Sequence, residues 1–139
     1  MIYKYLYTIF LLALCVLCIS CESSKIDQLE QEVEVLHDEV MPFLDDMKRQ
    51  RRMLVQLSDA NPPDSLRIRQ SIRMITQSDS LMWAWMDQYK RVEVLRDESM
   101  SDEKIEAYLV DQRQSAKTMN TAIKDAMAEA SEILGENKE

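Results

Sequence analysis

Apolar residues recur every three or four positions from Ile26 onward, the spacing that places side chains on one side of an α-helix. Pro42 lies inside this pattern, but the apolar phase continues across it, so we expect a kink rather than an end of the helix. The pattern, with one polar interruption at Gln50, predicts a long helix over about residues 25–58. Its positions are Ile26, Leu29, Val33, Leu36, Val40, Phe43, Met47, Gln50, Leu54 and Leu57.

Two prolines among Ser, Asp and Asn residues break this pattern at residues 58–65. Asp64 or Ser65 can cap the next helix, whose apolar stripe runs on to Leu95 and predicts a helix over about residues 65–97. The pattern lapses before residue 102, where Ser99 and Asp102 resemble a capping box. A third alternation predicts a helix over about residues 102–134, and Gly135 follows its last apolar positions, where glycine favours a helix end.

Three helices of similar length with short connections predict an all-α fold, an antiparallel up-down-up three-helix bundle over residues 26–135. The alternative is an open hairpin or a single coiled coil that completes its core with other copies, and a homo-oligomer stays possible on this pattern. The composition agrees with helices, because the 139 residues include one Gly and three Pro. No cysteine follows Cys21, so no disulfide is expected in the bundle.

The segment before the bundle reads as a signal peptide. After Lys4, an apolar run from Leu6 to Ile19 is about 14 residues long, short of the roughly 20 that a membrane-spanning helix needs. Ser20 precedes Cys21, and a small residue before a cysteine is what lipoprotein signal peptidase requires. We therefore expect residues 1–20 to be a lipoprotein signal peptide, Cys21 to carry acyl chains such as palmitate, and residues 21–25 to form a lipidated tether.

Two other interpretations of this segment are an ordinary secretory signal that is cut nearby and an uncleaved anchor helix. A lipoprotein of this kind is expected to be anchored in the outer membrane of the cell, where it faces the periplasm or is exposed at the surface. Several acyl chains on one cysteine give the stable anchoring that a single chain does not.

Charge and residue content exclude several functional classes. The net charge of −8 argues against a nucleic-acid partner. Neither a Ser/His/Asp set nor a Gly-rich phosphate loop is present, so we expect no enzyme and no cofactor. Residues 37–39 read His-Asp-Glu, but consecutive helical positions point about 100° apart, and the chain has no second histidine to complete a metal site.

Basic side chains gather toward the predicted distal tip of the bundle and could bind a partner. The candidates are Arg49, Arg52, Arg67 and Arg69. The alternative is that glutamates of the third helix pair with them, and these are Glu129, Glu132 and Glu136. Trp83 points away from the apolar centre of its helix, so we expect it to be partly exposed and a candidate anchor for a partner.

Methionines and tryptophans lie midway along the second helix. Met82 and Met86, one turn apart, are weak candidates for Cu(I) ligands, with Met41, Met47 or Met119 opposite them. Methionine is also an adaptable filler of helical cores, which explains these residues without a metal. The leading hypothesis is a non-enzymatic, lipid-anchored helical scaffold or protein-interaction module that binds another envelope protein. The alternative is a periplasmic carrier of a small ligand or of Cu(I) that uses the Met/Trp cluster.

Three short segments carry a resemblance to a known family. They are His37 to Pro42 (HDEVMP), Met82 with Trp85 and Met86, and Glu106 to Leu109 (EAYL). With them the chain resembles small lipoproteins of Bacteroidota-type bacteria, some of which are labelled "viral A-type inclusion protein". That family more often has Met-Met before the tryptophan motif, where this chain has Met82-Trp83-Ala84. The resemblance implies a lipid-anchored helical envelope protein and implies no activity.

Overall fold

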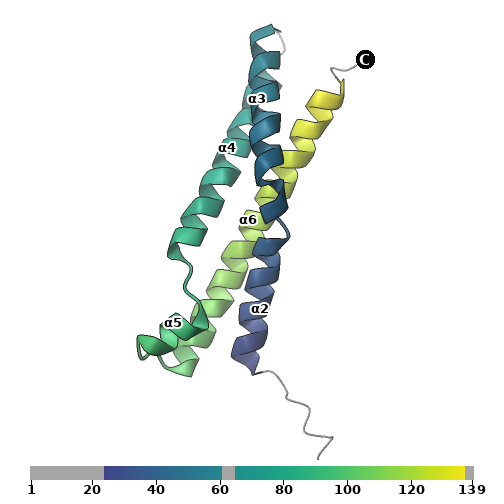
Figure 1. Ribbon diagram of the computed structural model, residues 1–139. Helices are drawn as coiled ribbons and strands as arrows, with labels where there is room; N and C mark the ends of the chain where they lie inside the picture. Colours follow the sequence, from purple (N-terminus) through teal and green to yellow (C-terminus); the bar gives the residue numbers. More distant parts are fainter. Residues whose placement is uncertain (1–23, 61–64, 137–139) are drawn as a thin grey trace, which may run out of the picture.

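The computed structural model describes residues 24–60 and 65–136, which form helices and turns without any strand. Three antiparallel legs lie side by side in an elongated bundle (Figure 1), so the predicted all-α up-down-up three-helix bundle is confirmed. The first leg contains α2 (Lys25–Asp38), the 3₁₀ turn η1 (Met41–Phe43) and α3 (Leu44–Ala60); the second contains α4 (Ser65–Gln88) and α5 (Val92–Asp97); the third is α6 (Asp102–Glu136). Within the described part of the chain, each helix is too short or too polar to cross a bilayer.

The first leg begins with a capping box. The Asp27 N–H donates to the Ser24 hydroxyl and the Ser24 N–H donates to the Asp27 carboxylate, each at 3.2 Å. These two bonds satisfy backbone donors that a helix N-terminus otherwise leaves free. The helix therefore starts at Lys25, so the last residue of the predicted tether is already helical.

The predicted single helix over 25–58 is wrong in one respect. The α-helix ends at Asp38, and Pro42 lies in the first turn of η1, after which α3 begins at Leu44. Proline removes a backbone donor and disfavours a helical conformation in the residue before it. The α-helix therefore ends here, and does not continue with a kink as predicted. The leg nevertheless keeps its direction (Figure 1), because Val40 within the break stays fully buried.

The second leg differs more from its prediction, since a continuous helix over 65–97 is wrong. Helix α4 ends at Gln88, and a non-helical linker of residues 89–91 leads into the short α5. The Lys90 N–H donates to the Tyr108 hydroxyl and the Val92 N–H donates to a Glu30 carboxylate oxygen, both at 2.7 Å. These bonds to α6 and α2 replace the helical bonds that the linker gives up.

Two helix ends also differ from expectation. Ser99, with φ 61°, follows α5 in a Schellman motif in which the Met100 N–H donates to the Leu95 carbonyl at 3.0 Å. Ser99 therefore ends α5 rather than capping the third helix, which Ser101 precedes directly. Gly135 does not end α6, because the helix includes it and runs on to Glu136.

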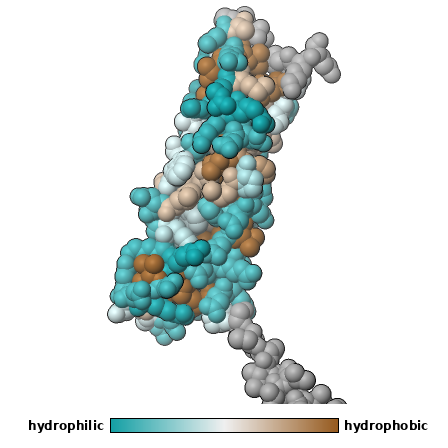
Figure 2. All heavy atoms as spheres, viewed as in Figure 1, coloured by the Kyte–Doolittle hydropathy of each residue, from teal (hydrophilic) through white to brown (hydrophobic). Residues whose placement is uncertain are grey.

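Buried apolar side chains form two separate clusters, and in Figure 1 α3 and α4, which supply the first, lie above α2 and α5, which supply the second. The upper core, between α3, α4 and α6, contains Val40, Met47, Leu54, Ile68, Ile75, Met82, Met119, Ile123, Ala126, Ala130 and Ile133. The lower core, between α2, α5 and α6, contains Ile26, Leu29, Val92, Leu95, Ile105 and Leu109. Figure 2 shows a largely hydrophilic surface with brown apolar patches along it. Among the described helices, α6 is the one that supplies buried residues to both cores, and it does so without a break.

Candidate functional site

Three aromatic rings stack between the two cores. The ring of His37, in the last turn of α2, stacks on Trp85 of α4 with centroids 5.4 Å apart and planes at 30°. Trp85 stacks in turn on Tyr89, with centroids 4.8 Å apart and planes at 17°. Trp85 packs against the upper core and Tyr89 against the lower one, so these rings join the two. We call His37, Trp85 and Tyr89 the aromatic waist.

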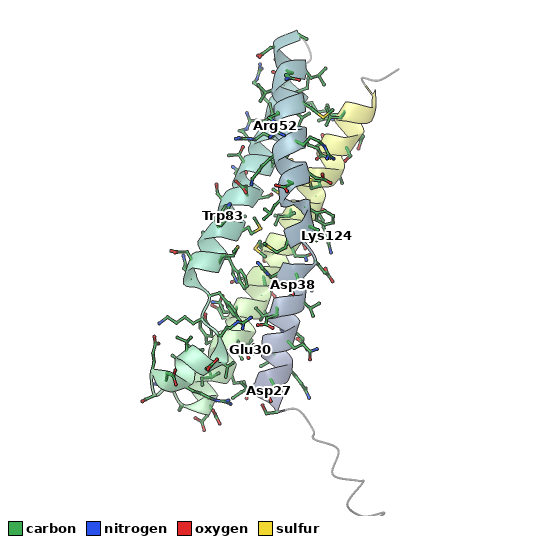
Figure 3. The ribbon with its side chains drawn as sticks, in the orientation of Figure 1. Asp27, Glu30, Asp38, Arg52, Trp83 and Lys124 are labelled. Atoms are coloured by element: carbon green, nitrogen blue, oxygen red, sulfur yellow. The ribbon has the colours of Figure 1, made fainter. Side chains whose placement is uncertain are left out.

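Two helix C-termini point toward the aromatic waist. Helix α2 rises to its end at Asp38, while α4 descends to its end at Gln88 (Figure 1). The last turn of each helix carries a partial negative charge from carbonyl groups that have no helical donor. The waist therefore lies in a negative backbone field, to which the carboxylate of Asp38 adds (Figure 3).

Each residue of the aromatic waist has a buried polar atom without a hydrogen-bond partner among the described residues. These atoms are His37 Nε2, Trp85 Nε1 and the Tyr89 hydroxyl. The other ring nitrogen of His37, Nδ1, lies 3.0 Å from an Asp38 carboxylate oxygen. Buried polar groups in folded proteins are nearly always paired, so three unpaired atoms in one stack are unusual, and none of the three has surface that a water molecule could reach.

A cavity of about 270 Å³ opens beside these rings. Its lining combines aromatic rings, one thioether and charged groups, from Glu34, His37, Asp38, Trp85, Met86, Tyr89 and Arg91. Arg91 Nη2 lies 3.1 Å from a Glu34 carboxylate oxygen, and the Arg91 side chain is 70% exposed. Burial, followed by the nearby carboxylates of Glu30 and Glu34, raises the pKa of Tyr89 far above its ordinary value, so the phenol stays neutral.

The methionines proposed as copper ligands lie together at the level of the upper core. Met47, Met82 and Met119 are buried in that core, and Met41 and Met86 are partly buried against it. This arrangement is what packing by methionine produces, and the Cu(I) hypothesis stays a prediction. Across the described ranges, no three His, Cys, Asp or Glu side chains are arranged to hold a metal ion.

Trp83 lies on the outer surface of α4 with 52% of its surface exposed, in line with its predicted direction (Figure 3). Its indole N–H donates to an Asp79 carboxylate oxygen at 3.2 Å, one helical turn away. Leu81, 48% exposed, lies on the other flank of the same surface, at a shallow hollow of about 510 Å³. The hollow is lined only by the uncharged residues Thr76, Gln77, Ser80, Leu81 and Ala84. We call this hollow together with Trp83 the α4 face.

Two of the predicted tip arginines have acidic partners. Arg67 reaches across to α6, where its Nε lies 2.8 Å from a Glu129 oxygen and its Nη2 lies 2.7 Å from a Glu132 oxygen. Arg49 Nη1 lies 2.7 Å from an Asp46 oxygen within α3. The pairing that the sequence offered as an alternative is therefore formed for Arg67, while the side chain of Glu136 lies outside the described part.

The other two arginines lie on different helices. Arg69 donates to the hydroxyl of Ser65, one turn earlier on α4. Arg52 lines a groove of about 260 Å³ between α3 and α4, which also contains Asp79, the hydrogen-bond partner of Trp83. The structure thus places Arg52 near Asp79, the residue that holds Trp83 of the α4 face.

The predicted lipidation site, Cys21, and the signal peptide lie outside the described residues. Comparison with protein-family models, with curated proteins and with solved structures finds no match to this chain. The resemblance to small envelope lipoproteins therefore stays a prediction.

Proposed function

We propose that this protein is a non-enzymatic, lipid-anchored helical module of the outer membrane that binds another envelope protein through the α4 face. The observation that carries the proposal is the half-exposed Trp83, whose ring is held in place by Asp79. Tryptophan is enriched among the residues that dominate binding energy, and a side chain that is already ordered loses less entropy on binding.

The surroundings of Trp83 indicate what the partner presents. The hollow of the α4 face has no charged residue in its lining, so it favours apolar side chains of a partner. The neighbouring groove between α3 and α4 contains the basic residues Lys48, Arg51 and Arg52. A partner with apolar side chains over the hollow and carboxylates over the groove would match both surfaces.

A lipid on Cys21 would set the height of the α4 face above the membrane. Helix α2 begins at Lys25, directly after its cap at Ser24, so few residues separate the proposed lipid from the bundle. The lower core would then lie next to the bilayer and the α4 face above it. Acyl chains on one cysteine are sufficient for stable anchoring without a spanning helix.

Site-specific photocrosslinking in cells tests the binding surface. A benzophenone amino acid at Ala84 reports on the α4 face, and the same group at Val110 of α6, which is 43% exposed, serves as the control. We expect one protein adduct from position 84 and none from position 110. In a Trp83→Ala background the adduct should fall about tenfold, as expected for the loss of a hot-spot side chain.

Equal adducts from positions 84 and 110, or an adduct that Trp83→Ala leaves unchanged, would contradict the binding surface. The anchor is tested separately by mass spectrometry of the native N-terminus and by fractionation of a Cys21→Ser variant. We expect an acylated Cys21 in the native protein and loss of the variant from the membrane fraction. An unacylated N-terminus would contradict the anchor and leave the binding test intact.

A further inference from the structure

We propose that residues 89–91 form a hinge between two forms of the second leg. One is the broken form of Figure 1, and in the other α4 and α5 make a single continuous helix. The Tyr108 hydroxyl and the Glu30 carboxylate hold the broken form. The hinge does not depend on the function proposed for the α4 face, because residues 76–84 belong to α4 in both forms.

The local sequence gives no reason for the break. Residues 65–97 contain neither glycine nor proline, and the linker reads Tyr-Lys-Arg, in which lysine and arginine are good helix formers. Arg91, at the N-cap position of α5, makes no capping bond with its side chain. A break without a local cause is held by contacts from elsewhere in the fold.

Tyr108 of α6 inserts its hydroxyl into the hydrogen-bond ladder at the end of α4. In a continuous helix the Lys90 N–H would donate to the carbonyl four residues earlier, and the Gln88 carbonyl would accept from Val92. Instead the Lys90 N–H donates to the Tyr108 hydroxyl at 2.7 Å, and that hydroxyl donates to the Gln88 carbonyl at 3.5 Å. A side chain that enters the ladder in this way interrupts a helix.

Glu30 of α2 holds the other side of the break. The Val92 N–H, whose helical acceptor would be Gln88, donates to a Glu30 carboxylate oxygen at 2.7 Å (Figure 3 labels Glu30). A charged acceptor makes this bond stronger than one between neutral groups. The ion pairs of the linker are exposed and contribute little. The broken form therefore depends on two side-chain groups from two other helices.

The continuous form keeps the apolar contacts of this leg and restores its helical bonds. Tyr89, Val92 and Leu95 continue the apolar stripe of α4 at helical spacing. The two bonds to Tyr108 and Glu30 would be exchanged for the helical bonds of residues 90–92. A helix over residues 65–97 would be about 50 Å long, which matches the 35-residue α6 at about 52 Å. A partner that contacts α5 and prefers one form would shift the population toward it.

NMR of the full-length chain in a non-ionic detergent tests the hinge, with the ¹³Cα shifts of Lys90 and Arg91 as the measure of helical backbone. In the wild type we expect relaxation dispersion at residues 89–92 from a minor form of about 1–10%, with helical ¹³Cα shifts. Tyr108→Phe and Glu30→Ala should each raise its population about fivefold, as expected for one lost hydrogen bond. The double variant should move both shifts furthest toward helical values.

Three further variants are matched to these. Tyr89→Phe removes a neighbouring phenol hydroxyl that has no hydrogen-bond partner among the described residues, so it should leave the shifts unchanged. Glu32→Ala removes another carboxylate of α2, which pairs with Arg113, and should also have no effect. Glu30→Gln keeps an acceptor oxygen at the same place and should retain the break.

The amide signals of α3 show whether each variant is folded, and where a variant is not, the wild-type dispersion decides. The hinge is overturned if the wild type shows no exchange at residues 89–92, or if the minor form is not helical there. It is also overturned if the folded double variant keeps non-helical shifts at Lys90 and Arg91, or if Tyr89→Phe or Glu32→Ala moves them as far. In these cases the break is a fixed part of the fold.

Discussion

The upper and lower cores are built from different amounts of helix. Three helices, α3, α4 and α6, enclose the upper core, whereas the third side of the lower core is the six-residue α5. A helix this short is not stable on its own, so α5 depends on its contacts with α2 and α6. The comparison teaches that one bundle can contain two levels of stability, and that the lower core should open first.

The largest effect on stability is expected when a buried leucine of either core is replaced by alanine. Leu54 of the upper core is fully buried and Leu95 of α5 is 1% exposed. We expect Leu54→Ala to lower the free energy of unfolding by about 3 kcal/mol, because it leaves a cavity that three helices cannot close. Leu95→Ala should cost less, about 2 kcal/mol, because α5 can detach while the upper core stays folded.

Urea denaturation measures both costs, and amide hydrogen exchange of residues 92–97 shows where the chain opens. Leu95→Ala should accelerate exchange in α5 and leave the amides of α3 protected. Equal costs for the two variants, with uniform exchange along the chain, would show that the cores unfold as one unit.

The next largest effect concerns the junction between the cores. Asn120 of α6 is buried, and its side-chain amide donates to the Leu36 carbonyl at 2.7 Å and to a Glu39 oxygen at 3.1 Å. Asn120→Ala leaves the carbonyl without this donor near the end of α2, so we expect a loss of about 1–2 kcal/mol in urea.

Lys124→Met is the control for Asn120, because it removes the exposed ion pair with the same Glu39, in which the charged atoms lie 2.8 Å apart. An exposed pair of this kind contributes little to stability, because water screens the charges. A Lys124→Met variant that is less stable than Asn120→Ala would mean that charge, not the buried amide, holds the junction.

A smaller, stabilising effect is expected at the end of α5. Ser99 has a left-handed backbone, which costs a residue with a Cβ atom about 1 kcal/mol relative to glycine. Ser99→Gly should therefore raise the melting temperature by a few degrees and slow exchange in α5, with part of the gain offset by glycine's freedom in the unfolded chain. Ser99→Ala keeps the strain and should give no gain; a gain of equal size in both variants would contradict this explanation.

The smallest effect is confined to alkaline pH. The pKa of Tyr89 is raised in the fold, so the folded state favours the protonated phenol. The stability that this gives is complete below the unfolded pKa of about 10 and is lost as the pH rises above it. Between pH 9 and 11 the melting temperature should fall more steeply for the wild type than for Tyr89→Phe. Parallel curves would show that Tyr89 does not contribute to the loss of stability at alkaline pH.

The apolar seams of the bundle could be predicted from spacing alone. Every position of the first predicted seam is buried or partly buried, including the polar Gln50, whose amide donates to the Ser131 hydroxyl at 2.8 Å. The break after Gln88 could not be predicted, because Tyr89, Val92 and Leu95 continue the apolar pattern. It depends on Glu30 and Tyr108, which are distant in the sequence.

Among the features of the candidate sites, some could also be predicted from the local sequence and others could not. The exposure of Trp83 follows from its helical phase, which is a local property. The stack of His37 on Trp85 is a contact between two helices, whereas the sequence around His37 suggests only a metal site, because its neighbours are Asp38 and Glu39. Arg67 has partners that depend on which helices become neighbours, whereas Arg49 and Arg69 have partners one turn away on their own helices.

Helix α6 also has a consequence for the order of events during synthesis. Both cores take side chains from α6, which leaves the ribosome after all the other described helices. The earlier helices can form hairpins as they emerge, but neither the upper nor the lower core is complete until α6 is available. A chain with this topology stays loosely packed until its last helix has been made.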